Sequence, residues 1–149
     1  MLTLEDAIEL ATKAHKGQKD LSGMPYILHP LHTMSKMNTI SEMIVAVLHD
    51  VTEDTDYTIG TIGMMGITEE IHDALVILDK NKHEGATKEE KYENMIKKIK
   101  VNHIARKVKI ADLEHNMDLR RIINRENLKE EDLKRFQRYM WAWSYLTGK

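Results

Sequence analysis

Apolar side chains recur along most of the chain at spacings of three and four residues, which is the period of an amphipathic helix. This pattern predicts helices over about 4–16, 30–37, 41–54, 68–79, 87–100, 102–116 and 129–146, with a loop or a short helical turn over 57–66. Strand-like alternation is nearly absent, so we expect an all-α fold, a compact bundle of about seven or eight helices. Because no repeat, low-complexity tract or linker interrupts the pattern, residues 1–149 are predicted to form one domain.

Capping residues mark where several of these helices begin. Thr87 with Glu90 has the spacing of a capping box, and Ser41 and Asn102 are the predicted N-caps of two other helices. The first half of the 41–54 segment is apolar on every side, which is typical of a buried helix. The last helix carries four large apolar side chains on one face: Leu133, Phe136, Met140 and Trp143.

The composition restricts the chemistry that the protein can perform. The 149 residues include no cysteine, so any transition metal must be bound by nitrogen and oxygen from the eight histidines and 24 acidic residues. A net charge of -2 gives no broad attraction for nucleic acid. The N-terminus is acidic and amphipathic, unlike a signal peptide, and no apolar run approaches the roughly 18 residues that cross a bilayer. We therefore expect a cytoplasmic protein without a nucleic-acid or membrane partner; the sequence does not fix the oligomeric state, and a homo-oligomer is compatible with it.

The 41–54 segment carries the strongest candidate for a chemical site. At roughly 100° per residue, the side chains at positions 49, 50, 53 and 54 fall within an arc of about 140° on a regular helix. The helix dipole disfavours carboxylates at this C-terminal end by a few tenths to about 1 kcal/mol each, and a bound divalent cation would reverse that penalty. The alternative, a solvated helix end in which His49 is a hydrogen-bonded core residue, is equally compatible with this segment alone.

Asp112 lies on an apolar face of the 102–116 segment, where an ionised carboxylate is costly unless it is paired or bound to a metal. Arg106 and Lys109 are the basic residues near it, but both are expected to project well round the helix. Asn116, one turn later on the same side, could donate a hydrogen bond to a substrate oxygen or to the metal shell. A structural role for this asparagine, holding the next loop, is equally compatible with the spacing.

A further histidine is expected at the junction before the second helix. His29 precedes Pro30, at a position well suited to aiming a side chain inward. His32 lies one turn later, and spacing alone does not choose between the two as a metal ligand.

Three segments together resemble the His-Asp (HD) metal-phosphohydrolase superfamily: AHKGQKDLSGMPYILHP (14–30), VAVLHDVTEDT (45–55) and KIADLEHNMDL (109–119). More closely, they resemble the hydrolase domain of the RelA/SpoT alarmone enzymes and the free-standing small alarmone hydrolases. The resemblance implies an all-α domain that binds a divalent metal, usually Mn²⁺, through four ligands: His29, His49, Asp50 and Asp112. It further implies that the attacking water is oriented and deprotonated by Glu53 and Asp54, and that Asn116 contacts the substrate.

The activity implied by the resemblance is hydrolysis of a nucleotide phosphoester by a metal-activated water. The first substrate to consider is the 3′-pyrophosphate of a guanosine alarmone, ppGpp or pppGpp. Two other functions stay open: a monophosphatase acting on NADPH or a nucleoside monophosphate, and a nucleotide sensor without catalysis. Since the chain ends where a synthetase domain begins in the long enzymes, the resemblance implies hydrolysis alone.

The first motif departs from the family at the nucleotide pocket. The family has an Arg-Lys pair before the Ser-Gly of this motif, where this sequence has Asp20 and Leu21 before Ser22. Ser22 and Lys19 are the remaining candidates for contacts with the nucleotide, and Lys19 could replace the missing charge. A solvated lysine at this position is the alternative.

Overall fold

The computed structural model describes residues 1–121 and 128–149. Within these ranges the all-α prediction is confirmed, since the chain forms nine α-helices, seven of them with eight or more residues, and two short 3₁₀ helices. No helix there is both long enough and apolar enough to span a bilayer. The elements in chain order are α1 (Leu4–Ala14), α2 (Leu28–Ser35), α3 (Ile40–Leu48), α4 (Val51–Asp54), α5 (Ile59–Gly63), α6 (Glu69–Leu78), η1 (Lys80–Lys82), α7 (Lys88–Lys100), α8 (His103–Asn116), η2 (Leu119–Arg121) and α9 (Glu130–Thr147).

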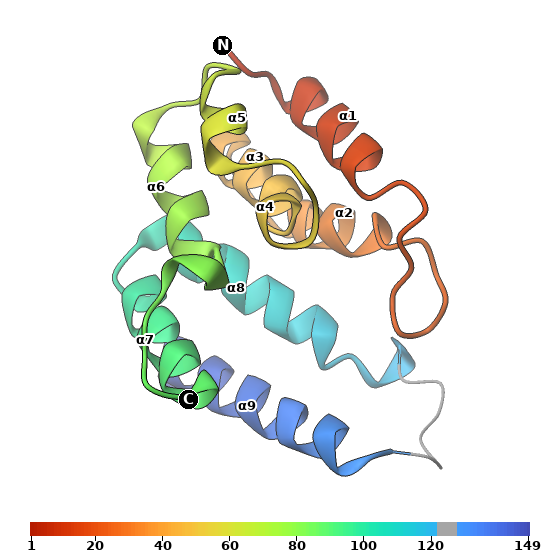
Figure 1. Cartoon of the computed structure of the whole chain (residues 1–149), viewed down its shortest axis with the longest axis vertical. Coiled ribbons are helices and arrows are strands. Elements are labelled where there is room, and N and C mark those ends of the chain that lie inside the picture. Colours follow the sequence, from red (N-terminus) through yellow and green to blue (C-terminus); the bar gives the residue numbers. More distant parts are fainter. Residues whose placement is uncertain (122–127) are drawn as a thin grey trace.

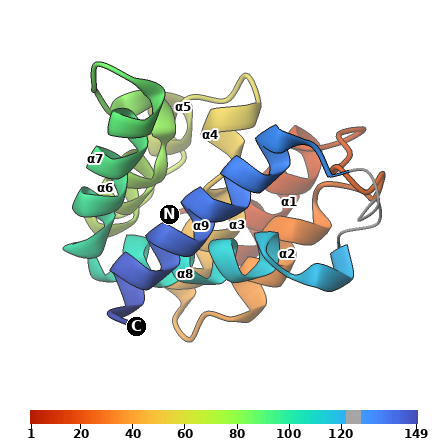
Figure 2. The ribbon, with the colours of Figure 1, turned by 90° about the horizontal axis from the view of Figure 1, so that it is seen from below.

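Two helices form the centre of the bundle. Helix α3 packs against α1, α2, α6 and α8, and helix α8 packs against α2, α3, α6, α7 and α9 (Figure 1). In the perpendicular view, α9 lies across the face that carries α8 (Figure 2). The prediction that the first half of the 41–54 segment is buried is confirmed, because residues 44–48 of α3 are all buried. Side chains near the ends of α2, α3 and α8 therefore reach the same interior region.

Most helix starts follow from local capping. Thr87 and Asn102 cap α7 and α8 as predicted, each accepting a hydrogen bond from a backbone N–H of the first turn. The predicted cap of α3 at Ser41 is wrong. Thr39 accepts from the Glu42 N–H at 3.2 Å, and the Glu42 carboxylate accepts from the Thr39 N–H at 3.2 Å, so the helix begins two residues earlier with a complete capping box.

The single helix predicted over 41–54 is also wrong, because α3 ends at Leu48 and α4 begins at Val51. The reason is a side-chain hydrogen bond: the His49 Nδ1 lies 2.6 Å from the carbonyl oxygen of Ala46. A continuing helix would use that oxygen to accept from the Asp50 N–H, so the imidazole competes with the helix for its acceptor. His49 and Asp50 therefore occupy the junction of two helices rather than one regular face.

Helix α9 packs through a different face from the one that its large apolar residues suggest. Its buried residues are Ala142 and Leu146, whereas Leu133 and Met140 are 52% and 55% exposed. Leu133 and Met140 are turned outward, whereas Trp143 is half-buried and packs against the core. The N-terminal half of α9 also contributes Phe136 to a pocket described below.

Candidate active site

The structure brings together the four side chains that the resemblance implies as metal ligands. His29 lies on α2, His49 and Asp50 lie at the α3–α4 junction, and Asp112 lies on α8. One nitrogen or carboxylate oxygen from each lies within 4.8 Å of those of the other three, and all four residues are buried. Three separate parts of the sequence therefore converge on one small volume.

The arrangement of donor atoms suits a divalent cation. The His49 Nδ1 faces the Ala46 carbonyl, which can only accept, so Nδ1 carries the proton and the lone pair of the neutral ring is on Nε2. That Nε2 is buried without a hydrogen-bond partner, 3.2 Å from Asp50 Oδ2 and 3.6 Å from Asp112 Oδ1. The His29 Nε2 lies 2.8 Å from the same Asp112 oxygen. A buried, unpartnered nitrogen beside two carboxylates fits an ion bound by imidazole and oxygen ligands.

The charge of the cluster determines the protonation of His49. Burial by itself would lower the pKa of this imidazole, but the carboxylates of Asp50 and Asp112 outweigh burial and raise the pKa to about 10. Without a cation, a proton on His49 therefore compensates the two carboxylates. A divalent ion has to displace that proton, so its binding is expected to weaken as the pH falls.

The other nitrogen of His29 is oriented by a histidine that sequence reasoning did not assign to the site. His29 Nδ1 lies 2.7 Å from His115 Nδ1, and the His115 ring stacks between those of His29 and His32, at centroid distances of 5.0 and 3.9 Å. Burial and the positive charge of Arg121 lower the pKa of His115 to about 4, so its neutral ring can accept from His29. His32 thus stacks on His115, outside the four-residue cluster.

Three polar groups hold the carboxylates of the cluster. Lys109 Nζ lies 2.8 Å from Asp112 Oδ2, and Asn116 Nδ2 donates to Asp112 Oδ1 at 3.0 Å. The Tyr26 hydroxyl donates to Asp50 Oδ2 at 2.7 Å. The expectation that Lys109 projects away from Asp112 is wrong, because residues three apart are neighbours on a helix surface and the long lysine side chain spans the remaining distance.

Glu53 and Asp54 lie on α4, next to the cluster. Glu53 is half-buried, and its Oε1 accepts from the Lys80 N–H at 2.7 Å. Burial, and then the charge of Asp50, raise the pKa of Glu53, and the same two causes raise the pKa of Asp54. Two carboxyl groups with raised pKa values beside a candidate metal cluster are candidates for accepting and releasing protons.

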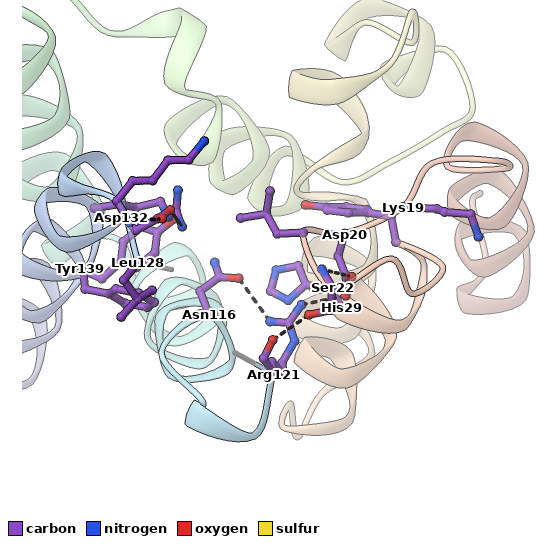
Figure 3. Close-up of a pocket in the computed structure, with 14 residues that line it drawn as sticks. Lys19, Asp20, Ser22, His29, Asn116, Arg121, Leu128, Asp132 and Tyr139 are labelled. Carbon is purple, nitrogen blue, oxygen red and sulfur yellow. Dashed lines mark hydrogen bonds and ion pairs between the residues drawn. The ribbon is translucent and has the colours of Figure 1, made fainter. Parts of the chain in front are cut away.

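A pocket of about 600 Å³ opens beside the cluster (Figure 3). His29 and Asn116 line its inner part, and α9 contributes aromatic side chains to the opposite wall, Phe136 and Tyr139. The three residues expected to contact the substrate all line it. The Ser22 hydroxyl donates to the Arg121 carbonyl at 2.6 Å, whereas Lys19 is exposed and its side chain runs away from Asn116 in Figure 3.

Known proteins are similar to the chain in sequence and in fold, although no protein-family model matches it. Over 134 residues, which is 86% of the chain, it is 28% identical to a GTP pyrophosphokinase of Streptomyces coelicolor. Over 59 residues, 37% of the chain, it is 41% identical to a guanosine-3′,5′-bis(diphosphate) 3′-pyrophosphohydrolase of Aquifex aeolicus. The solved structure of a metazoan ortholog of SpoT that hydrolyzes ppGpp aligns with a TM-score of 0.76 and 18% identity, covering 97% of this chain and 85% of that chain.

The chain resembles the RelA/SpoT alarmone enzymes. It spans 16% of the length of the Streptomyces relative and 8% of the Aquifex relative. The structural similarity to the SpoT ortholog shows that the two chains have the same fold.

Two basic residues near the site of this RelA/SpoT-like chain could not be assigned from the sequence. Helix geometry predicts that Lys109 projects away from Asp112, and the position of Arg121 in the pocket depends on a contact with Asp20 across 101 residues. The spacing of apolar residues along the chain gives no information about contacts between residues so far apart in the sequence. The one sequence feature that could indicate Lys109 is its position three residues before Asp112, which is the spacing of neighbours on a helix surface.

Proposed function

We propose that this protein hydrolyses the 3′-pyrophosphate of a guanosine alarmone, ppGpp or pppGpp, with a divalent metal ion. The observation that carries the proposal is the buried cluster of His29, His49, Asp50 and Asp112, with an unpartnered imidazole nitrogen at its centre. A small-molecule nucleotide is its proposed partner, and the cytoplasm is its proposed compartment. Supporting evidence is the similarity to relatives named for reactions of guanosine bis(diphosphate) or GTP.

Mn²⁺ is the proposed ion. Two imidazole nitrogens and two carboxylates suit a moderately hard divalent ion better than a thiolate-seeking one. When bound, such an ion lowers the pKa of a coordinated water and offsets the negative charge of phosphate oxygens. The chain's own contribution is to orient its ligands: the Ala46 carbonyl fixes the His49 ring, and Tyr26 fixes one oxygen of Asp50.

Glu53 and Asp54 are proposed to orient the attacking water and to carry its proton. The raised pKa of each carboxyl makes it a better proton acceptor than an ordinary surface carboxylate. The Lys80 backbone N–H holds Oε1 of Glu53, and Lys80 Nζ lies 3.5 Å from its Oε2, so Lys80 fixes the orientation of this carboxyl group. Asn116, which lies in the pocket and contacts Asp112, is proposed to donate a hydrogen bond to the substrate.

The identity of the product tests this proposal. Purified protein with Mn²⁺ and ppGpp is expected to release pyrophosphate and GDP in equal amounts, and Asp50→Ala is expected to reduce release to background. Asp56→Ala is the matched control, because Asp56 is exposed in the same segment and lies outside the cluster. Orthophosphate as the product would instead support a monophosphatase. Nucleotide binding without turnover, with metal present, would support a sensor.

A further inference from the structure

Arg121 lies in the wall of the pocket, next to the proposed metal cluster and outside it. Its guanidinium donates to the His115 carbonyl at 2.9 Å and to the Asn116 Oδ1 at 3.4 Å. Asn116 in turn donates to Asp112, so one side chain separates Arg121 from the cluster (Figure 3). An anion bound to Arg121 would therefore lie beside the reacting phosphate, at a second position in the same pocket.

The loop after α1 holds Arg121 in place by its backbone and its side chain. The Ser22 hydroxyl donates to the Arg121 carbonyl at 2.6 Å, and Arg121 faces Asp20 Oδ2 at 3.4 Å. The other oxygen of Asp20 accepts the backbone N–H groups of Ser22 and Met24, at 2.9 and 3.0 Å. The short hydrogen bonds of Asp20 are therefore with its own loop, and its contact with Arg121, at 3.4 Å, is the longest of the three.

This arrangement leaves binding capacity on the guanidinium. An arginine has five N–H donors, and three contacts with described residues use at most three of them, none from Nε. Ion pairs that satisfy an arginine bring nitrogen and oxygen to about 2.7–2.9 Å, shorter than the distance to Asp20. The side chain is 24% exposed, so a ligand in the pocket can reach it.

The charges around Arg121 favour an anionic ligand. The described lining of the pocket carries four cationic side chains, Lys19, Arg121, Lys129 and Arg135, against two carboxylates, Asp20 and Asp132. Asp132 lies 2.8 Å from Arg135 and is thereby committed to that residue. A concave wall with excess positive charge raises the local concentration of anions. A planar guanidinium whose remaining N–H groups are not used by the described residues matches the oxygens of a phosphate.

We propose that Arg121, whose backbone is held by Ser22, binds a second phosphate group of the substrate, away from the one that is cleaved. The inference rests on the proposed function, and it makes Arg121 a specificity-determining residue for nucleotides that carry phosphates at both ends. A nucleotide with phosphate only at the reacting end would gain nothing from this contact.

The test is the affinity for GDP, which carries a 5′-diphosphate and has no 3′-phosphate to hydrolyse. In calorimetric titrations of the Mn²⁺-loaded protein, Arg121→Gln is expected to raise the Kd for GDP about tenfold to a hundredfold, the range of a charge-assisted hydrogen bond. Glutamine keeps a donor for the His115 carbonyl. Arg120→Gln is the matched control, since Arg120 is 88% exposed and paired with Asp118.

A second variant gives the opposite result, which a merely structural role would not produce. Asp20→Asn keeps an oxygen for the loop N–H groups and removes the competing charge, so the Kd for GDP is expected to fall a few-fold. In kinetics, Arg121→Gln is expected to raise KM for ppGpp with little change in kcat, and to leave guanosine 3′-diphosphate unaffected. Arg121→Lys is expected to recover part of the loss.

The outcomes separate this inference from the proposed function. Arg121-dependent binding of GDP by a protein that releases no pyrophosphate would support the second phosphate site while overturning the proposed reaction. Pyrophosphate release with the same KM in wild type and Arg121→Gln would overturn the inference alone. An unchanged Kd for GDP in Arg121→Gln and in Asp20→Asn, with thermal unfolding as in the wild type, would also overturn it.

Discussion

Replacing Lys109 by methionine removes the cation that compensates Asp112 in the described structure. The two side chains are 15% and 6% exposed, and their charged atoms lie 2.8 Å apart. Burial alone would raise the pKa of Asp112, but the charge of Lys109, the His29 Nε2 at 2.8 Å and the charge of His49 hold that pKa well below its usual range. Methionine has a similar length and no charge, so the variant leaves a buried carboxylate without its lysine.

The size of the effect follows from the burial of both partners. Removing one member of a buried ion pair costs about 3–5 kcal/mol, because the remaining charge stays desolvated without its partner. That is a large part of the 5–15 kcal/mol that is typical of a domain's total stability. A divalent ion beside Asp112 supplies positive charge to the same carboxylate. Saturating Mn²⁺ is therefore expected to recover part of the loss, because the ion stabilises the variant more than the wild type.

The assay is urea unfolding at pH 7, in chelator and in saturating Mn²⁺. Lys107→Met is the control: Lys107 is on the same helix and lies 2.7 Å from Glu42, outside the cluster. Its loss is expected to be the same with and without Mn²⁺. The reasoning would be refuted if Lys109→Met unfolded within about 1 kcal/mol of the wild type in chelator. An equal response of both variants to Mn²⁺ would refute the link between Lys109 and the metal.

Two further predictions concern the scaffold. The Lys107 ammonium and backbone N–H groups outweigh the burial of Glu42 and lower its pKa from 4.5, so its stabilisation is present above that pH and is lost as the pH falls through the lowered pKa. Glu42→Gln is expected to cost about 1.5–3 kcal/mol at pH 7 in urea unfolding and progressively less as the pH falls below 4.5; a cost that does not change with pH would contradict this. A Cβ on Gly85 would lie 2.6 Å from the Lys91 backbone nitrogen, so Gly85→Ala is expected to lower the free energy of unfolding by about 1–3 kcal/mol. Gly63→Ala meets nothing within 4 Å, and equal stability of the two variants would argue against that contact.

Features determined by local sequence were predictable. Helices α7 and α8 begin and end within one residue of the predicted ranges, because Thr87 and Asn102 cap them and the apolar period is regular. The break at His49 was not predictable in the same way. It depends on the rotamer that brings the imidazole to the Ala46 carbonyl, and a helical wheel contains no such information.

In the candidate site, too, the sequence predicts some residues and not others. The motifs brought four residues to attention, and the structure places them in one buried cluster. The groups around them depend on tertiary contacts: His115 meets His29 across 86 residues, and Arg121 meets Asp20 across 101. Contacts of this kind arise only when the helices pack, so motif reading could find the proposed metal ligands but not the contacts of His115 and Arg121.

The most direct test of the proposed site is a crystal structure with Mn²⁺, recorded at wavelengths on both sides of the manganese absorption edge. A single anomalous peak is expected within about 2.0–2.3 Å of His29 Nε2, His49 Nε2 and an oxygen from each of Asp50 and Asp112. A peak elsewhere, or none at saturating Mn²⁺ with the four side chains still in contact, would contradict the proposal that these residues hold the ion for hydrolysis.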